Sequence, residues 1–146
     1  MDRRKIALVT GSSKGIGAAI AVALAHDGFD LWLNYRNNHE AAAGTQKKVE
    51  QTGAACLLLP FDVCDPEATE KVLGPKLEVE TPYVLVNNAG LARDGLMALM
   101  SQKDWKDVIS VTLDGFFQVT RGVVKGMLRK KAGRIINIVS TSGQSG

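Results

Sequence analysis

A glycine-spaced loop near the amino terminus restricts the fold of this chain more than any other feature. Gly11, Gly15 and Gly17 follow an apolar run at 6–9 and precede an alanine-rich amphipathic run at 18–25. This order predicts a strand, a loop and a helix. Gly11 would make the sharp turn, Gly15 would let a ligand approach the backbone, and Gly17 would let helix and strand pack closely. The helix would direct its free N–H groups towards an anion such as a pyrophosphate.

The loop pattern alone leaves other interpretations open. Three residues separate its first two glycines, where the usual dinucleotide fingerprint has one, so an ordinary strand–helix turn is an alternative. A P-loop is excluded because Ala18-Ala19 stand where Lys and then Ser or Thr are required. Residues 11–15 also match the G-x-S-x-G nucleophile elbow. That motif needs a downstream acid followed by a histidine, but His26 and His39 precede nearly every candidate acid.

Length and composition restrict the class of protein further. The chain has 146 residues and a net charge of +3, which fits one domain or part of one and does not by itself indicate nucleic acid binding. No apolar run reaches the roughly 20 residues of a membrane span, and the run at 6–9 is too short for a signal peptide. We therefore expect a cytoplasmic protein without nucleic acid or membrane partners. The spacing of Cys56 and Cys64 predicts reduced thiols and no metal site.

Strand-like and helix-like segments alternate along the chain. The run at 54–61 is continuously apolar, which predicts a strand buried on both faces, and an apolar stripe along the last helix includes Thr112. The alternation predicts an α/β fold, a doubly wound parallel sheet of the Rossmann type with three αβα layers and five strands. We expect strands at 6–9, 30–35, 54–61, 83–86 and 134–139, and helices at 15–27, 39–52, 66–80 and about 101–131.

Polar or glycine-rich residues follow every predicted strand. Because the carboxyl ends of parallel strands meet at one edge, where doubly wound sheets bind ligands, we predict a dinucleotide site along that edge. A chance distribution would place similar residues at the opposite edge as well. The five strand ends carry the glycine loop, Tyr35-Arg36, Asp62-Val63, Asn87-Asn88-Ala89-Gly90 and Ser140.

The residues after the second strand discriminate between nicotinamide cofactors. An acid about 20 residues past the loop holds the ribose 2′-hydroxyl of NAD, whereas an Arg accepts the 2′-phosphate of NADP. Residues 34–37 are Asn-Tyr-Arg-Asn, and Lys14 can add a second positive charge. We therefore predict NADP(H) as the cofactor. The alternative is that Arg36 and Lys14 are solvated surface charges.

The other strand ends would hold the adenosine and ribose. Asp62 would accept a hydrogen bond from the adenine amino group while Val63 packs on the ring; the alternative is an Asp that caps the next helix. Residues 87–90 would contact a ribose, or tie neighbouring strands together, and both roles are compatible. The predicted cofactor-binding residues are Gly11, Ser13, Lys14, Gly15, Ile16, Gly17, Tyr35, Arg36, Asp62, Val63, Asn88, Ala89 and Gly90.

Together these motifs resemble the short-chain dehydrogenase/reductase family over the whole chain. Segments 88–97 and 133–138 are further similar to its 3-oxoacyl-acyl-carrier-protein reductases, which act in fatty acid biosynthesis. The resemblance implies NADPH-dependent reduction of a ketone, with a 3-oxoacyl thioester favoured and another ketone or a polyketide intermediate as alternatives. It also implies that Ser140 hydrogen-bonds the carbonyl oxygen, that a Tyr protonates the forming alkoxide, and that a Lys lowers the pKa of that Tyr.

Two departures from the family pattern concern catalysis. The tyrosines, Tyr35 and Tyr83, are followed four residues on by His39 and Asn87, so Tyr-x-x-x-Lys is absent. We therefore expect residues 1–146 to be an NADP-binding domain that is incomplete at its carboxyl terminus and, alone, an inert nucleotide-binding fragment. Thr112 replaces the family Asn that holds a water of the proton relay, so we expect reduced turnover. The alternative is a buried Thr bonded to its own helix backbone.

Two features of the last predicted helix concern partners. We expect a basic patch at its end to lie beside the rim of the site and to dock an acidic acyl carrier protein; the alternative is a set of cations that complement the helix dipole. Three glycines would permit close approach of another helix, and the resemblance implies that this helix forms a dimer face of a homotetramer. The basic residues are Arg129, Lys130, Lys131 and Arg134, and the glycines are Gly115, Gly122 and Gly126.

Overall fold

A parallel sheet of five strands forms the centre of the computed structural model, which describes residues 4–93 and 95–140. The strand order is β3-β2-β1-β4-β5, and each described pair is parallel. The chain adds β2 and β3 on one side of β1, and then β4 and β5 on the other side. The boundary between β1 and β4 is therefore the topological switch point, at which doubly wound sheets bind ligands. The strands are β1 (Ile6–Val9), β2 (Asp30–Tyr35), β3 (Cys56–Pro60), β4 (Val84–Asn87) and β5 (Arg134–Asn137).

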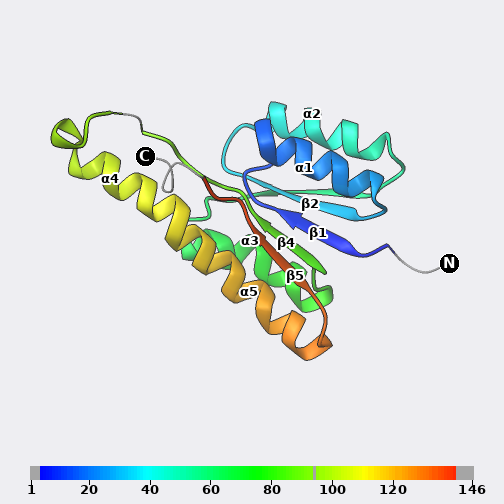
Figure 1. Ribbon diagram of the computed structural model, residues 1–146. Coiled ribbons are helices and arrows are strands. Elements are labelled where there is room, and N and C mark those ends of the chain that lie inside the picture. The colour runs from blue at the N-terminus through cyan, green and yellow to red at the C-terminus, as the bar shows by residue number, and fades with distance from the viewer. Residues whose placement is uncertain (1–3, 94, 141–146) are drawn as a thin grey trace.

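Helices cover both faces of the sheet, which confirms the predicted α/β fold with three layers. Figure 1 shows α1 (Gly15–His26) and α2 (His39–Glu50) on one face, and α3 (Pro66–Val79) and α5 (Gly115–Lys130) on the other. Each face has its own core. Along β1, Ile6 and Leu8 pack in the cluster that includes Val119 of α5, whereas Ala7 and Val9 pack in the cluster that includes Ala21 of α1. This alternation follows from the two-residue side-chain period of a strand.

Two of the helices begin with a capping side chain, directly before the helix starts predicted at 39 and 66. The Asn38 side chain accepts a hydrogen bond from the backbone N–H of Ala41 at 3.0 Å, at the start of α2. The Asp65 carboxylate accepts from the N–H groups of Glu67 and Ala68 at 2.9 and 3.0 Å, at the start of α3. These bonds satisfy amide groups that have no partner within the helix.

The third strand differs from the prediction. Its bounds are Cys56–Pro60 instead of 54–61, and Leu59 is its one buried residue. The reason is its place in the sheet: β3 is an edge strand and pairs with β2 alone among the described strands. An apolar run therefore does not distinguish a central strand from an edge strand that lies under helices.

The predicted long helix is interrupted by a different helical turn. After the short 3₁₀ turn η1 (Met97–Leu99) come α4 (Gln102–Ile109), the π-helical turn η2 (Ser110–Asp114) and then α5. Three stripe residues of α5 are buried, namely Val119, Val123 and Met127. Phe116 of α5 and Trp105 of α4 are 37% and 53% exposed. Thr112 is also exposed, so the alternative of a buried Thr is wrong. Figure 1 shows the cause, since α4 extends beyond the edge of the sheet.

The three glycines of α5 contact parts of the same chain. A Cβ at Gly126 would overlap Thr81, one at Gly122 would lie 3.3 Å from Leu77 of α3, and one at Gly115 would overlap Val63. The predicted close approach of another helix is therefore an intramolecular one for Gly122, towards α3. The other two glycines adjoin the loops on either side of that helix.

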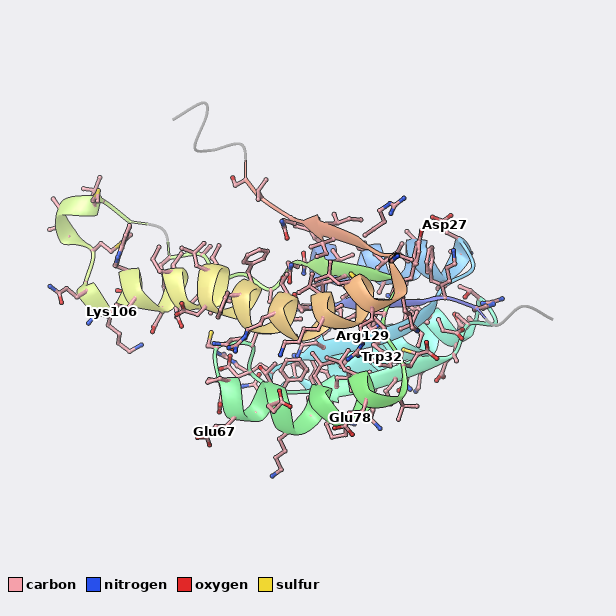
Figure 2. All side chains as sticks on the ribbon, turned by 90° about the horizontal axis from the view of Figure 1, so that it is seen from below. Asp27, Trp32, Glu67, Glu78, Lys106 and Arg129 are labelled. Atoms are coloured by element: carbon pink, nitrogen blue, oxygen red, sulfur yellow. The ribbon has the colours of Figure 1, made fainter. Side chains whose placement is uncertain are left out.

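The basic patch lies at the opposite edge of the sheet from the one predicted. Its residues lie at the end of α5 and the start of β5, so they stand at the amino ends of the strands. The Lys130 ammonium is 3.0 Å from the Glu80 carboxylate, and the Arg134 guanidinium lies 6.0 Å from the centre of the Tyr83 ring. Figure 2 shows Lys106 and Arg129 near opposite ends of the long helix. The prediction failed because a helix that crosses a sheet begins at one edge and ends at the other.

The cysteines are free thiols, as predicted. Burial raises the pKa of Cys56 to about 12, and burial is also the main cause of the raised pKa of Cys64. Within residues 4–93 and 95–140, no group of three or more metal-ligating side chains comes together, and no helix has the length and apolarity to cross a bilayer.

Candidate functional site

The glycine loop has the geometry that its three glycines predicted. Gly11 and Gly15 have φ angles of +62° and +59°, in the left-handed region that favours glycine. A Cβ at Gly15 would meet nothing within 4 Å, so this backbone is open to a ligand. A Cβ at Gly17 would lie 2.5 Å from Asn88 Nδ2 and closer still to the Gly11 carbonyl oxygen, so only glycine fits there. No described side chain caps α1 at Lys14, which leaves its first N–H groups available to an anion.

The end of β4 holds the glycine loop in place. Asn88 Nδ2 donates to the carbonyl oxygens of Thr10 and Gly11 at 3.0 and 3.1 Å, and the backbone N–H groups of Asn88 and Ala89 both donate to Thr10 Oγ1 at 3.0 Å. The Asn88 side-chain amide thus ties strands together, while the backbone of residues 88–90 remains at the groove described below.

Asn34 anchors the other side of the loop and was not among the predicted site residues. Its side chain is 2% exposed and accepts a hydrogen bond from Gly11 N at 3.3 Å. Its Nδ2 donates to the carbonyl oxygens of Leu59 and Phe61 at 3.3 and 2.9 Å, and its own carbonyl oxygen accepts from Ser12. One amide therefore joins β2, the end of β3 and the loop. The sequence did contain a signal for this role, because Asn34 is a polar residue among the apolar residues of a buried strand.

One groove of about 540 Å³ collects the predicted cofactor-binding residues at the carboxyl edge of the sheet. Two of them lie outside its lining: Ile16, which is 65% exposed, and Gly17, which is buried under the loop. Asn34, Asn37, Asn38, Phe61, Leu91 and Val111 complete the lining and were not predicted. The predicted residues that line it are Gly11, Ser13, Lys14, Gly15, Tyr35, Arg36, Asp62, Val63, Asn88, Ala89 and Gly90.

Charges in the groove are separated along its length. Lys14 and Arg36 are exposed cations beside the ends of β1 and β2. Asp62 follows β3 and is the one acid among the described lining residues. Its Oδ1 accepts from Cys64 N at 2.9 Å, so it shapes the turn, whereas Asp65 caps α3. The alternative of Asp62 as the helix cap is therefore wrong.

A second, mostly apolar pocket of about 230 Å³ adjoins the groove, because Val63 and Ala89 line both cavities. Its lining includes Thr112, the residue that stands in place of the family Asn. Ser140 is exposed and lies beyond Val139, three residues after the end of β5 and outside the lining of this pocket. The other pocket residues are Thr10, Asn87, Leu113, Gly115, Phe116, Asn137, Ile138 and Val139.

The sheet order, the open glycine turn and the groove define a Rossmann-type dinucleotide-binding protein. The family model of the short chain dehydrogenases matches residues 5–146, and the chain belongs to this family. Membership implies a nicotinamide nucleotide as the cofactor. The residues present fit such a group, since Gly15 leaves room for it and Lys14 and Arg36 carry the charge that its phosphates require.

The chain is similar to curated relatives over almost its whole length. It is 38% identical over 143 residues to a 3-oxoacyl-[acyl-carrier-protein] reductase of Synechocystis sp., covering 97% of this chain and 58% of the relative. It is 42% identical over 145 residues to an acetoacetyl-CoA reductase of Paracoccus denitrificans, covering 96% and 56%. A solved structure described as a short-chain alcohol dehydrogenase, from Sinorhizobium meliloti 1021, superposes with a TM-score of 0.89 at 33% identity, covering 99% and 58%. The chain thus spans 56–58% of the length of these three proteins.

Proposed function

We propose that this chain holds NADP(H) for the reduction of a ketone to an alcohol, with a 3-oxoacyl thioester as the favoured substrate. The observation that carries the cofactor preference is that Lys14 and Arg36 line one groove with the glycine loop. Asp62, the acid of the described lining, follows β3, and the turn after β2 contributes Arg36, Asn37 and Asn38 instead. A 2′-phosphate beside β2 would meet positive charge where NAD-specific proteins present a carboxylate.

Replacement of the Arg36 side chain tests this preference. We expect Arg36→Ala to raise the dissociation constant of NADPH about 30-fold and that of NADH less than about twofold, because a charge-assisted hydrogen bond to a phosphate contributes roughly 2 kcal/mol. Both constants are measured by calorimetric titration of the purified protein. Arg134→Ala, at the opposite edge of the sheet, is the matched control and should change neither. Equal wild-type affinities for NADPH and NADH would contradict the proposal.

The residues of this chain would perform two tasks once the cofactor, which supplies the hydride, is bound. The Ser140 hydroxyl would donate a hydrogen bond to the substrate carbonyl oxygen as negative charge develops there. Leu113 and Phe116 would exclude water from the adjoining pocket. The sequence holds no Tyr-x-x-x-Lys, so for residues 1–146 alone we propose nucleotide binding without turnover.

Thr112 is proposed to hold a water of the proton relay less rigidly than an amide would. It is exposed and lines the second pocket, so its hydroxyl can reach such a water. In the enzyme expressed from its natural reading frame, we expect Thr112→Asn to raise kcat about threefold with KM unchanged, while Thr112→Ser leaves both unchanged. Steady-state kinetics with an acetoacetyl thioester measures this. Unchanged turnover in Thr112→Asn would rule out the relay role.

We also propose an acyl carrier protein as the bearer of the substrate and a homotetramer as the assembly. The support for the carrier is the positive charge of Arg129, Lys130 and Lys131, which would attract an acidic protein. This patch lies at the amino ends of the strands, at the opposite edge of the sheet from the groove.

A further inference from the structure

We propose that Val63 is a positioning residue that links the two adjoining cavities. These are the groove at the glycine loop, called the nucleotide groove below, and the second, mostly apolar pocket, called the substrate pocket. A nucleotide bound against Val63 and Val111 would fix the π-helical turn η2, and that turn carries Thr112 and Leu113 to the neighbouring pocket. The inference rests on the proposed nucleotide binding and goes beyond it, since it assigns an energetic coupling between two ligands. Its starting observation is that Val63 lines both cavities.

Val63 lies directly against the first residue of α5. The Val63 side chain is 6% exposed, and Gly115 is buried. A Cβ at Gly115 would lie 2.5 Å from Val63 Cγ2 and 3.1 Å from Val63 Cβ. The backbone at the end of η2 therefore rests on the Val63 side chain with no room for another carbon. A displacement of Val63 must move this backbone, because close-packed interiors transmit displacements.

A second contact holds the other end of the same turn. The Ser110 side chain interacts with the Cys64 thiol and lowers its pKa against the larger effect of burial, and Ser110 is the first residue of η2. The segment after β3 thus holds η2 at both ends, with Cys64 at Ser110 and Val63 at Gly115. The residues between them reach different cavities: Val111 lines the nucleotide groove, whereas Thr112 and Leu113 line the substrate pocket.

This arrangement gives the coupling a physical basis. A π-helical turn is rare and is found mainly at functional sites, and α4 before it extends beyond the sheet. A ligand that packs on Val63 and Val111 restricts the turn from the groove side. The substrate then meets Thr112 and Leu113 already in place and loses less conformational freedom on binding. By linkage, substrate must tighten nucleotide binding by the same factor.

Paired glycine substitutions test the contact. In the enzyme expressed from its natural reading frame, we expect Gly115→Ala to raise both the dissociation constant of NADPH and the KM of the ketone about tenfold, a coupling of ordinary size. Gly122→Ala is the matched control on the same helix, since its Cβ would lie 3.3 Å from Leu77 and away from both cavities. In a Val63→Ala background, which removes Cγ2 but keeps Cβ at 3.1 Å, Gly115→Ala should add a much smaller loss. Equal effects of Gly115→Ala in both backgrounds would overturn the proposal.

Hydrogen exchange provides a readout that a purely structural contact would not change. We expect saturating NADPH to slow amide exchange at residues 110–114 at least about threefold in the wild type and in Gly122→Ala, but not in Val63→Ala. Val63→Ala removes two methyl groups and introduces no steric overlap, so this variant should still fold. The comparison therefore holds even where Gly115→Ala fails to fold. If the wild type bound NADPH but showed no slower amide exchange at residues 110–114, the coupling would be overturned and the proposed function would stand. Absence of NADPH binding would overturn both.

Discussion

Gly17→Ala is expected to abolish measurable nucleotide binding and to lower the free energy of unfolding by about 3 kcal/mol. The added methyl group would overlap the Gly11 carbonyl oxygen and the Asn88 side-chain amide. That amide donates to Thr10 and Gly11, so relief of the overlap breaks the bonds that hold the loop. The sign of the change in unfolding free energy is informative, because Gly→Ala inside a helix normally stabilises the protein by up to about 1 kcal/mol.

Two control substitutions separate the steric overlap at Gly17 from the effects of alanine on helix propensity and on backbone strain. Gly44→Ala in α2 introduces a methyl group that meets nothing within 4 Å and should stabilise by about 0.5 kcal/mol. Gly15→Ala also meets open space but has a φ of +59°, so it should cost about 1 kcal/mol through backbone strain. Urea denaturation measures all three variants. If Gly17→Ala matched Gly44→Ala, the steric role of Gly17 would be refuted.

The sequence predicted the part of the site that depends on chain direction. In a parallel sheet with helical crossovers, every strand delivers its next residues to the same edge. The residues after β1, β2, β3 and β4 therefore had to meet, and they line one groove. Knowledge of their order and types was sufficient, without any side-chain geometry.

Features that depend on neighbours in space were not predictable in this way. The edge position of β3 depends on strand order, which an apolar run does not encode. The exposure of Trp105 arises because α4 passes beyond the sheet, although the residue continues a regular apolar period. The edge of the basic patch, by contrast, does follow from chain direction, because its residues stand between the end of a helix and the start of a strand; the prediction did not apply that rule. The contact between Val63 and Gly115 joins residues 52 positions apart, and no local pattern marks it.

Asn34→Asp is expected to cause a comparably large loss, of about 4 kcal/mol at pH 7, together with loss of NADPH binding. The substitution retains an acceptor for Gly11 N but removes both donors to the carbonyl oxygens of Leu59 and Phe61. A carboxylate would then face two carbonyl oxygens at a position that is 2% exposed. The side chain would lose its tie to the end of β3, so the residue that anchors the glycine loop would no longer be held in place from that side.

The pH dependence of this loss identifies its cause. Burial and the facing carbonyl oxygens would raise the pKa of the introduced carboxyl group in the folded state above its unfolded value of about 3.9. The folded state would then bind more protons than the unfolded state, so stability falls as pH rises from about 4 towards the raised pKa. Urea denaturation of Asn34→Asp relative to the wild type should show a difference that grows across this range. Asn38→Asp is the control, because an exposed Asp caps α2 as well as Asn does and adds no buried charge. A constant difference between pH 4 and 7 would mean that Asn34 acts through shape and not through its two donated hydrogen bonds.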